Sequence, residues 1–267
     1  VMAKGARVIA ISRFLADIVH HDYAVPAERL HVIHRGVDLE LFDPAAVSQE
    51  RVIQLARRWC LPDGVPVVML PARLSRWKGQ SLLLQALARL RDEREFLCLL
   101  VGAEQRRGYA EELPREAAAL GLGGQVYLAG TCDDMPAAYM LGDVVVSPSL
   151  EPEGFGRTVA EGQAMGRPVV AAGHGGALEQ VIDGETGFLV APGDAEALAA
   201  GLRRALDLDS ASRARLAARA RGHIAEHFAV EMMCLSTLRV YDEVLRAQAR
   251  PPARTAGASA EDVRRSA

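Results

Sequence analysis

The sequence predicts an α/β domain built on a doubly wound parallel sheet. Its strand candidates are continuous apolar runs without alternation, which is typical of strands buried on both faces. Helical segments alternate with these runs through short connections, as in a parallel sheet with right-handed crossovers. Half of the 267 residues are hydrophobic and 24% are charged, so a sizeable core is expected.

Two short strands and a helix are expected ahead of the main domain. Residues 8–12 form an apolar run that ends in Ser12, which can cap a helix over residues 13–21. Residues 30–33 give a second short strand. Residues 39–47 show no strong period and include a proline, so we expect a connector there.

The alternation becomes regular near Val65. Strands are expected over residues 67–70, 96–101, 126–129, 144–146, 169–172 and 188–190. Helices are expected over residues 79–91, 109–120, 135–141, 158–165 and 177–182, with three more near 194–207, 211–222 and 229–247. Residues 251–267 are rich in Pro, Arg, Ala, Ser and Gly, which predicts a disordered tail.

Composition excludes several classes of protein. A net charge of −3 does not suit a broad basic face, so no nucleic-acid partner is expected. The four cysteines are too widely spaced for a disulfide framework or a zinc site, which favours a reduced cytosolic location. The longest apolar runs, such as residues 96–101, are far shorter than the roughly 20 residues of a membrane span. No signal peptide is recognisable, and the chain runs from Val1 straight into a strand, as an internal piece of a longer protein would.

The first candidate site residues follow the strand at residues 67–70. In an open parallel sheet, ligands bind beyond the carboxyl ends of the strands. Arg73 and Lys78 lie there, at the start of a helix, and Lys78 is one of only two lysines. A guanidinium fork and a compact ammonium beside a helix N-terminus can converge on a diphosphate. The alternative is a solvated basic loop.

A second group follows the strand at residues 144–146. Gly154 and Gly156 let the backbone approach a ligand, and the next helix points N–H donors at it. Glu153 lies in the loop and Glu161 about one turn into the helix, where carboxylates can bind the hydroxyls of a sugar and a ribose. The alternative is that both are ordinary surface charges.

Other segments carry weaker signals. The turn over residues 172–179, with three glycines, could approach a phosphate or a sugar, or could be a plain tight turn. His223 and His227 have the spacing of helical metal ligands but no third ligand, so no metal site is expected. Asp133 and Asp134 are more typical of a helix cap. The first βα turn lacks the G-x-G-x-x-G of a dinucleotide-binding oxidoreductase.

Four segments together resemble retaining glycosyltransferases of family 4, which have the two-domain GT-B architecture. Residues 31–38 are similar to the family's interdomain segment V-I-P-N-G-V-D, and residues 73–78 match its R-x₄-K. Residues 153–161 match its E-x₇-E, and residues 166–190 match its terminal sheet block. The chain therefore resembles the C-terminal, donor-binding half of such an enzyme, from about Val8 to about Leu245.

The resemblance implies a function and a role for each candidate. The enzyme would transfer a sugar, with retention, from a nucleoside diphosphate sugar to a cell-surface glycan or a lipid-linked acceptor. Arg73 and Lys78 would stabilise the leaving diphosphate, Glu161 would bind the ribose, and Glu153 would face the sugar. Further donor contacts are implied for Gly154, Phe155, Gly156, Arg157, Thr158, Val159 and, near the base, Thr131. No metal or other cofactor is implied, because cations and a helix dipole stabilise the charge.

The resemblance also implies a domain division. Residues 1–43 would be a remnant of the acceptor domain with its connector, residues 44–228 the Rossmann-like donor domain, and residues 229–250 a helix packing towards the acceptor domain. The apolar faces of the first strand and of this helix are then expected to be exposed.

The sequence departs from the family pattern in places. His34 and Arg35 replace the usual Pro-Asn, and Arg157 replaces an aliphatic residue. The Phe-Gly-Arg variant at residues 155–157 is similar to bacterial transferases of lipopolysaccharide and surface glycans, which often contact the inner membrane. The resemblance implies that most of the acceptor domain is not part of this sequence, so the alternative function is an inactive donor-binding module that needs a separate acceptor half.

Overall fold

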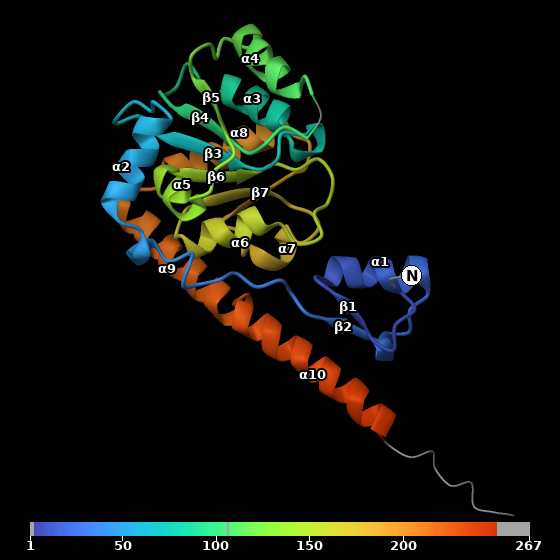
Figure 1. The fold of residues 1–267 in the computed structure, drawn as a ribbon. Helices are drawn as coiled ribbons and strands as arrows, with labels where there is room; N and C mark the ends of the chain where they lie inside the picture. The colour runs from blue at the N-terminus through green and yellow to red at the C-terminus, as the bar shows by residue number, and fades with distance from the viewer. Residues whose placement is uncertain (1–2, 106, 250–267) are drawn as a thin grey trace, which may run out of the picture.

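The main domain is built on a six-stranded sheet in the order β5-β4-β3-β6-β7-β8 (Figure 1). The computed structural model describes residues 3–105 and 107–249, so the predicted tail lies outside the described residues. The strands are β3 (Val67–Pro71), β4 (Leu97–Val101), β5 (Val126–Gly130), β6 (Val144–Ser147), β7 (Val169–Ala172) and β8 (Phe188–Val190). Every pairing between them is parallel, which confirms the predicted fold class.

The direction of strand addition reverses between β3 and β6. From β3 the chain moves outward through β4 to β5, then crosses to the other side of β3 and moves outward through β7 to β8. β3 and β6 pair through Val68–Val144 and Met69–Val145. Loops that follow two such strands diverge and leave a crevice, which is the usual ligand site of this fold. Arg73 and Lys78 follow one of these strands, and Glu153 follows the other.

Helices cover both faces of the sheet, and each face has its own hydrophobic core. One core, which includes the fully buried Leu83 and Leu198, involves α3 (Gln80–Ala88), α4 (Tyr109–Ala119) and α8 (Ala195–Leu206). The other, which includes Met69 and Tyr139, involves α5 (Met135–Leu141), α6 (Arg157–Ala164) and α7 (Ala177–Gln180). Helix α9 (Ser210–His227) contributes Leu216 to the first core and Ile224 to the second.

Helix α2 (Gln49–Arg58) is the main element that the sequence analysis does not predict. Ser48 caps it by accepting a hydrogen bond from the Arg51 N–H at 3.3 Å, and Leu55 is buried. The Arg51 guanidinium binds Asp134, the N-cap of α5, at 2.6 and 2.9 Å. Asp134 is therefore a helix cap, as predicted, and it also ties α2 to the main domain.

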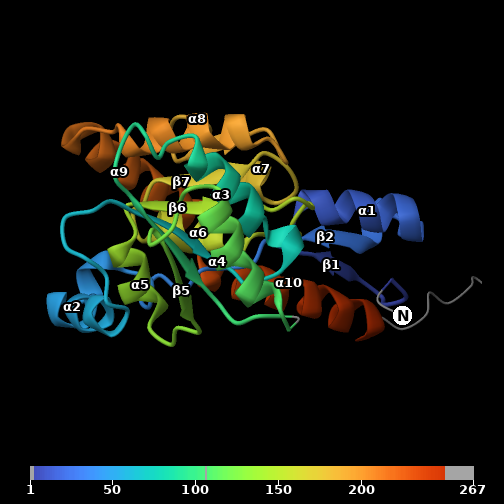
Figure 2. The same ribbon diagram turned by 90° about the horizontal axis from the view of Figure 1, so that it is seen from above.

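A small N-terminal unit stands beside the main domain. Strands β1 (Val8–Ala10) and β2 (Leu30–Val32) form a separate two-stranded parallel sheet, joined through α1 (Arg13–Tyr23). Ser12 caps α1, as its position predicts. Figures 1 and 2 show this unit and the last helix, α10 (Val230–Ala249), projecting from the same side of the main domain.

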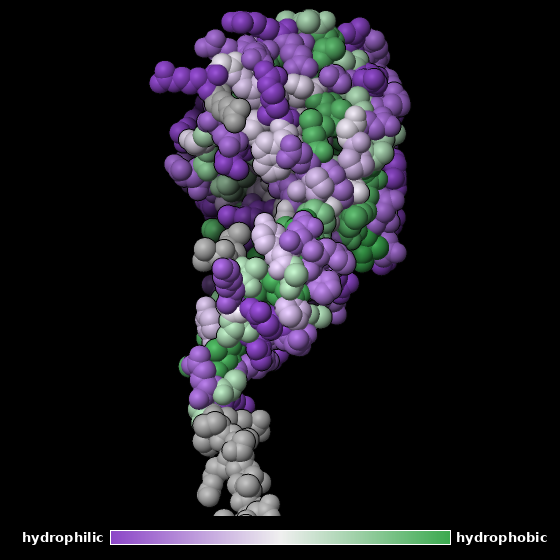
Figure 3. Space-filling model, turned by 90° about the vertical axis from the view of Figure 1, so that its right-hand side faces the viewer, coloured by the Kyte–Doolittle hydropathy of each residue, from purple (hydrophilic) through white to green (hydrophobic). Residues whose placement is uncertain are grey.

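The projecting part exposes apolar side chains, in agreement with the expectation for the first strand and the last helix. Ile9 on β1 and five residues along α10 are at least one-third exposed; the five are Met232, Leu235, Leu238, Tyr241 and Leu245. Figure 3 shows hydrophobic side chains among hydrophilic ones on this narrow lower part of the molecule. The opposite side of α10 is partly covered, with Val240 buried.

Candidate functional site

Two loops meet where the strand order reverses. The loop after β3 enters α3 through the short 3₁₀ turn Arg76–Lys78, and Gly79 follows it with a φ of +77°. A Cβ on Gly79 would collide with the carbonyl oxygen of Pro148, in the loop after β6. The Leu150 N–H donates to the Trp77 carbonyl at 2.7 Å. These contacts fix one loop against the other.

Lys78 and Glu153 form an ion pair at the centre of this junction. The Lys78 Nζ lies 2.6 Å from the Glu153 Oε2, and the two side chains are only 13% and 18% exposed. The Ser149 hydroxyl donates to the other oxygen, Glu153 Oε1, at 2.5 Å. The ammonium also lies 4.3 Å from the centre of the Trp77 ring. Two of the predicted catalytic residues are thus brought together, and their charged groups are paired with each other.

Arg73 is the third predicted catalytic residue, and it is exposed. Its backbone carbonyl accepts from Gln80 at 2.9 Å, which anchors its loop to α3. Within the described residues, its guanidinium makes no ion pair, in contrast to that of Arg76, which binds Glu112 at 2.6 Å. The Arg73 guanidinium is therefore accessible to a ligand.

The glycine-rich loop leads into α6. Gly156 is the N-cap of this helix and has a φ of +87°. The side chains of Phe155 and Val159 are buried in the core, and the Thr158 hydroxyl donates to the Pro71 carbonyl at 2.8 Å. Of these predicted contact residues, Phe155 and Val159 can therefore offer a ligand only their backbone groups.

Glu161 is almost buried, and other residues already bind its carboxylate. The Tyr139 hydroxyl donates to Oε2 at 2.9 Å, and the Arg157 guanidinium donates to Oε1 at 2.8 and 3.1 Å. Burial and the neighbouring Glu161 charge hold the pKa of Tyr139 well above its ordinary value. Arg157 is 71% exposed, so it is the partner that can move aside for a hydroxyl.

Thr131 lies in the loop after β5, two strands away from β3 in the sheet. It is exposed, and the preceding Gly130 has a φ of +68°. The structure thus places Thr131 on the same edge of the sheet as the pair Lys78–Glu153, but on a separate loop.

His174, for which the sequence predicts no role of its own, lies next to Ser149 and Glu153 in the structure. Its Nε2 lies 2.9 Å from the Ser149 carbonyl oxygen, which can only accept, so Nε2 carries the proton. His174 lines a small pocket together with Glu153, Gly156 and Val159. The sequence did indicate the glycine-rich turn after β7 that contains His174, but not the histidine itself.

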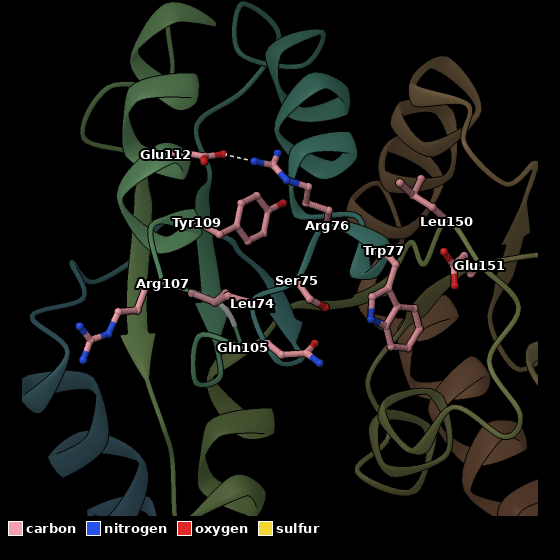
Figure 4. Close-up of a pocket in the computed structure, with 10 residues that line it drawn as sticks. All are labelled: Leu74, Ser75, Arg76, Trp77, Gln105, Arg107, Tyr109, Glu112, Leu150 and Glu151. Atoms are coloured by element: carbon pink, nitrogen blue, oxygen red, sulfur yellow. Dashed lines mark hydrogen bonds and ion pairs between the residues drawn. The ribbon is translucent and has the colours of Figure 1, made fainter.

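A larger cavity of about 540 Å³ lies beside the pair Lys78–Glu153 (Figure 4). None of the predicted site residues lines it, but Trp77 and Glu151 border it from the two loops that carry Lys78 and Glu153. Its walls are formed by Leu74, Ser75, Arg76, Trp77, Gln105, Arg107, Tyr109, Glu112, Leu150 and Glu151.

The remaining weak candidates stay apart from this ion pair. The rings of His223 and His227 lie 4.8 Å apart, edge to face. In residues 3–105 and 107–249, no group of three or more His, Cys, Asp or Glu side chains is placed to hold a metal ion. The same residues contain no helix long and apolar enough to cross a membrane.

Comparison with known proteins finds two family matches. The family described as "Glycosyl transferases group 1" matches residues 54–223, and the one described as "Glycosyltransferase Family 4" matches residues 1–41.

Curated relatives are similar over most of this chain. A D-inositol 3-phosphate glycosyltransferase of Salinispora arenicola is 35% identical over 92% of this chain and 57% of its own length. An MMP α-(1→4)-mannosyltransferase of Mycolicibacterium hassiacum is 34% identical over 89% of this chain and 54% of its own. The chain thus spans little more than half the length of these relatives.

Solved structures share the fold closely. A glycosyltransferase of Rickettsia africae superimposes with a TM-score of 0.88 at 33% identity, over 92% of this chain and 65% of that one. Anabaena HepE, solved with UDP and glucose, gives 0.81 at 30% identity, over 90% and 64%.

Proposed function

The chain belongs to the glycosyl transferases group 1 family, and from this we propose that it binds the nucleoside diphosphate sugar donor of a glycosyl transfer. The proposal rests mainly on the charged residues in the loops where the strand order reverses. Lys78 is paired there with Glu153, and Arg73 lies in the same loop as Lys78 with its side chain exposed. The HepE structures, described as complexes with UDP and with UDP-glucose, support this class of donor.

The diphosphate binds to Arg73 and Lys78. As the donor enters, its phosphate oxygens compete with Glu153 for the Lys78 ammonium. Glu153 is then released towards the sugar, where positive charge develops as the bond to the leaving phosphate breaks. The two cations and the N–H groups at the start of α6 stabilise the negative charge that accumulates on the leaving diphosphate. This division of roles needs no metal ion.

The remaining donor contacts follow from the positions of the side chains. Arg157 swings away from Glu161, which then binds the ribose hydroxyls and keeps its hydrogen bond from Tyr139. Arg157 reaches the sugar or a phosphate instead. The base lies over the loop at Thr131, and the sugar lies on the exposed side of Glu153, next to Gly156 and His174. Transfer proceeds with retention, as the resemblance to family 4 implies.

The acceptor is a hydroxyl of a sugar or of a cyclic polyol. Several curated relatives are named for D-inositol 3-phosphate, and this favours a small hydroxylated acceptor over the lipopolysaccharide that the Phe-Gly-Arg variant suggests. A cell-surface or lipid-linked glycan, reached by an enzyme acting in the cytoplasm near the inner membrane, is the alternative acceptor. A donor-binding module that depends on a separate acceptor half is the second candidate, because the chain covers only part of its relatives.

Calorimetric titration with UDP, GDP and ADP and with their glucose or mannose conjugates tests the proposal. At least one nucleoside diphosphate should bind, and Lys78→Ala should weaken it at least about tenfold while leaving the nucleoside unaffected. Lys4→Ala, which removes the only other lysine, is the matched control. Arg76→Ala is the control for Arg73→Ala, since Arg76 is an exposed cation of the same loop. Failure of every nucleotide to bind would refute the proposal.

A further inference from the structure

Glu179 joins the main domain to the N-terminal unit. It lies on α7 of the main domain, and its carboxylate accepts from the backbone N–H groups of Arg13 at 3.0 Å and of Phe14 at 3.1 Å. These are the first two residues of α1. The His34 Nε2 lies 2.7 Å from the same carboxylate, and the Glu179 and His34 side chains are 14% and 24% exposed. All three hydrogen-bond partners thus belong to the other unit or to its connector.

The same short helix holds the loop that carries Glu153. The N–H of Gly176, just before α7, donates to the Glu153 carbonyl at 2.8 Å, and the Gln180 side chain donates to the Phe155 carbonyl. A Cβ on Gly175 would lie 2.5 Å from the Glu153 carbonyl oxygen, so the two backbones are in direct contact. Loop 153–156 is therefore attached to α7 through contacts to its backbone near both of its ends.

The opposite side of this loop touches α1. A Cβ on Gly154 would lie 2.7 Å from the Leu15 Cδ1 and 3.8 Å from the Ile11 Cδ1. Leu15 immediately follows the two residues whose N–H groups bind Glu179. Loop 153–156 is therefore clamped between α7 and the first turn of α1.

We propose that Glu179 is a positioning residue, which seats the first turn of α1 so that Leu15 presses on Gly154 and fixes where the loop presents Glu153. A carboxylate is suited to this task, because it neutralises the positive end of α1 and accepts several N–H donors at once. The position of the N-terminal unit is then coupled to the carboxylate that faces the donor sugar. The use of this coupling in sugar selection rests on the proposed function, whereas the coupling itself does not.

Hydrogen exchange of the ligand-free chain tests the coupling directly. The amide of Ala16, bonded to the Ser12 carbonyl, reports on α1, and the amide of Val159, bonded to the Gly156 carbonyl, reports on the loop and α6. In Glu179→Ala both should exchange about tenfold faster, since bonds to a charged acceptor are worth at least that factor. Glu179→Gln, which keeps one acceptor oxygen, should show a smaller change at both. Acceleration at Ala16 alone would mean that Glu179 only caps α1, and would overturn the proposal.

Glu243 provides a matched control. Its carboxylate also faces two side chains of the N-terminal unit, Arg7 at 3.9 Å and His31 at 3.8 Å, but it lies on α10, away from the loop. Glu243→Gln should change the exchange of neither reporter. An equal effect at Val159 would mean that any loosening of the unit disturbs the loop, and would contradict a specific role for Glu179.

Donor titration then tests the consequence for the sugar. Glu179→Ala should leave the affinity for the nucleoside diphosphate within about twofold and remove most of the extra affinity contributed by the sugar. Leu15→Ala should do the same, and the double variant should lose no more than either single one, because both act through one contact. Additive losses would show that the two residues act independently and would refute the proposal. Absence of any nucleotide binding by the parent chain would instead refute the proposed function, and the exchange experiment would still judge the coupling.

Discussion

The Nζ atom of Lys78 lies 2.6 Å from the Oε2 atom of Glu153, so a cation and a carboxylate expected to bind different parts of one donor are paired with each other. Both side chains are mostly buried, and burial makes the pair sensitive to the loss of one member, since the remaining charge would be uncompensated. A donor must therefore exchange this ion pair for contacts with its own diphosphate and sugar.

Glu153→Gln should strengthen the binding of free nucleoside diphosphate by a few-fold. The amide no longer competes for Lys78, and it removes a negative charge from the neighbourhood of the phosphates. The same variant should lose the extra affinity that the sugar contributes, and in the longer enzyme it should lower kcat. Calorimetry with the diphosphate and with its sugar conjugate measures both effects. Weaker diphosphate binding would show that Glu153 organises Lys78 rather than competing for it.

The two partners of Glu161 should differ in their effect on stability. Tyr139→Phe removes a buried hydroxyl donor from a buried carboxylate, so we expect a loss of about 1–3 kcal/mol in the free energy of unfolding. Arg157→Ala removes a guanidinium that is 71% exposed and pairs with Glu161 at i,i+4 spacing, so about 0.5 kcal/mol or less is expected. Urea denaturation at neutral pH measures both. Equal losses would mean that the exposed guanidinium contributes as much as the buried hydroxyl.

The individual elements were largely predictable because their signals are local. The apolar runs at β7 and β8 and the Ser12 cap of α1 each lie in a few consecutive residues, and their positions agree with the structure. Helix α2 escaped prediction because its sequence is dominated by charged and polar residues, and only Leu55 is fully covered. Its position depends on the pair between Arg51 and Asp134, 83 residues apart, which no local pattern encodes.

The candidate site was likewise predictable only where its signals are local in the sequence. The spacing of Arg73 and Lys78, and of Glu153 and Glu161, marked the loops that the structure brings to the reversal of strand order. The partners that occupy these groups come from elsewhere in the chain: Tyr139 reaches Glu161 from α5, and His174 reaches the Ser149 carbonyl from the turn after β7. Hydrogen bonds between distant segments are a product of packing, so periodicity and spacing could not reveal them.

The attachment of α1 to Glu179 should weaken in acid. Burial works to raise the pKa of this carboxyl, but the hydrogen bonds from Arg13, His34 and Phe14 outweigh it and hold the pKa below its ordinary 4.5. A depressed pKa in the folded state contributes stability that is fully present above the unfolded value and is lost as the pH falls through the folded value. The difference in unfolding free energy between the parent and Glu179→Gln should therefore shrink as the pH falls below about 4.5. A difference that grows below pH 4.5 would contradict this assignment.

The exposed apolar side of α10 should make the chain associate. Leu235, Leu238, Tyr241 and Leu245 are 52%, 61%, 59% and 64% exposed, whereas Val240 on the opposite side of the same helix is 5% exposed. Burying one such leucine is worth about 1.5–3 kcal/mol, so contact between two copies is favourable. Leu238 and Leu245 lie seven residues apart, and hence on the same side of the helix.

Replacing both Leu238 and Leu245 by Glu should therefore reduce association, measured by sedimentation across a range of protein concentrations, and lower the binding of a hydrophobic dye. Because neither side chain belongs to either core, the unfolding free energy of the main domain should change by no more than about 0.5 kcal/mol. Val240→Glu is the matched control: it places the same charge on the covered side, so it should loosen the packing of α10 and increase dye binding. If the parent chain sediments as a monomer at all concentrations and binds no dye, the exposed side of α10 does not drive association.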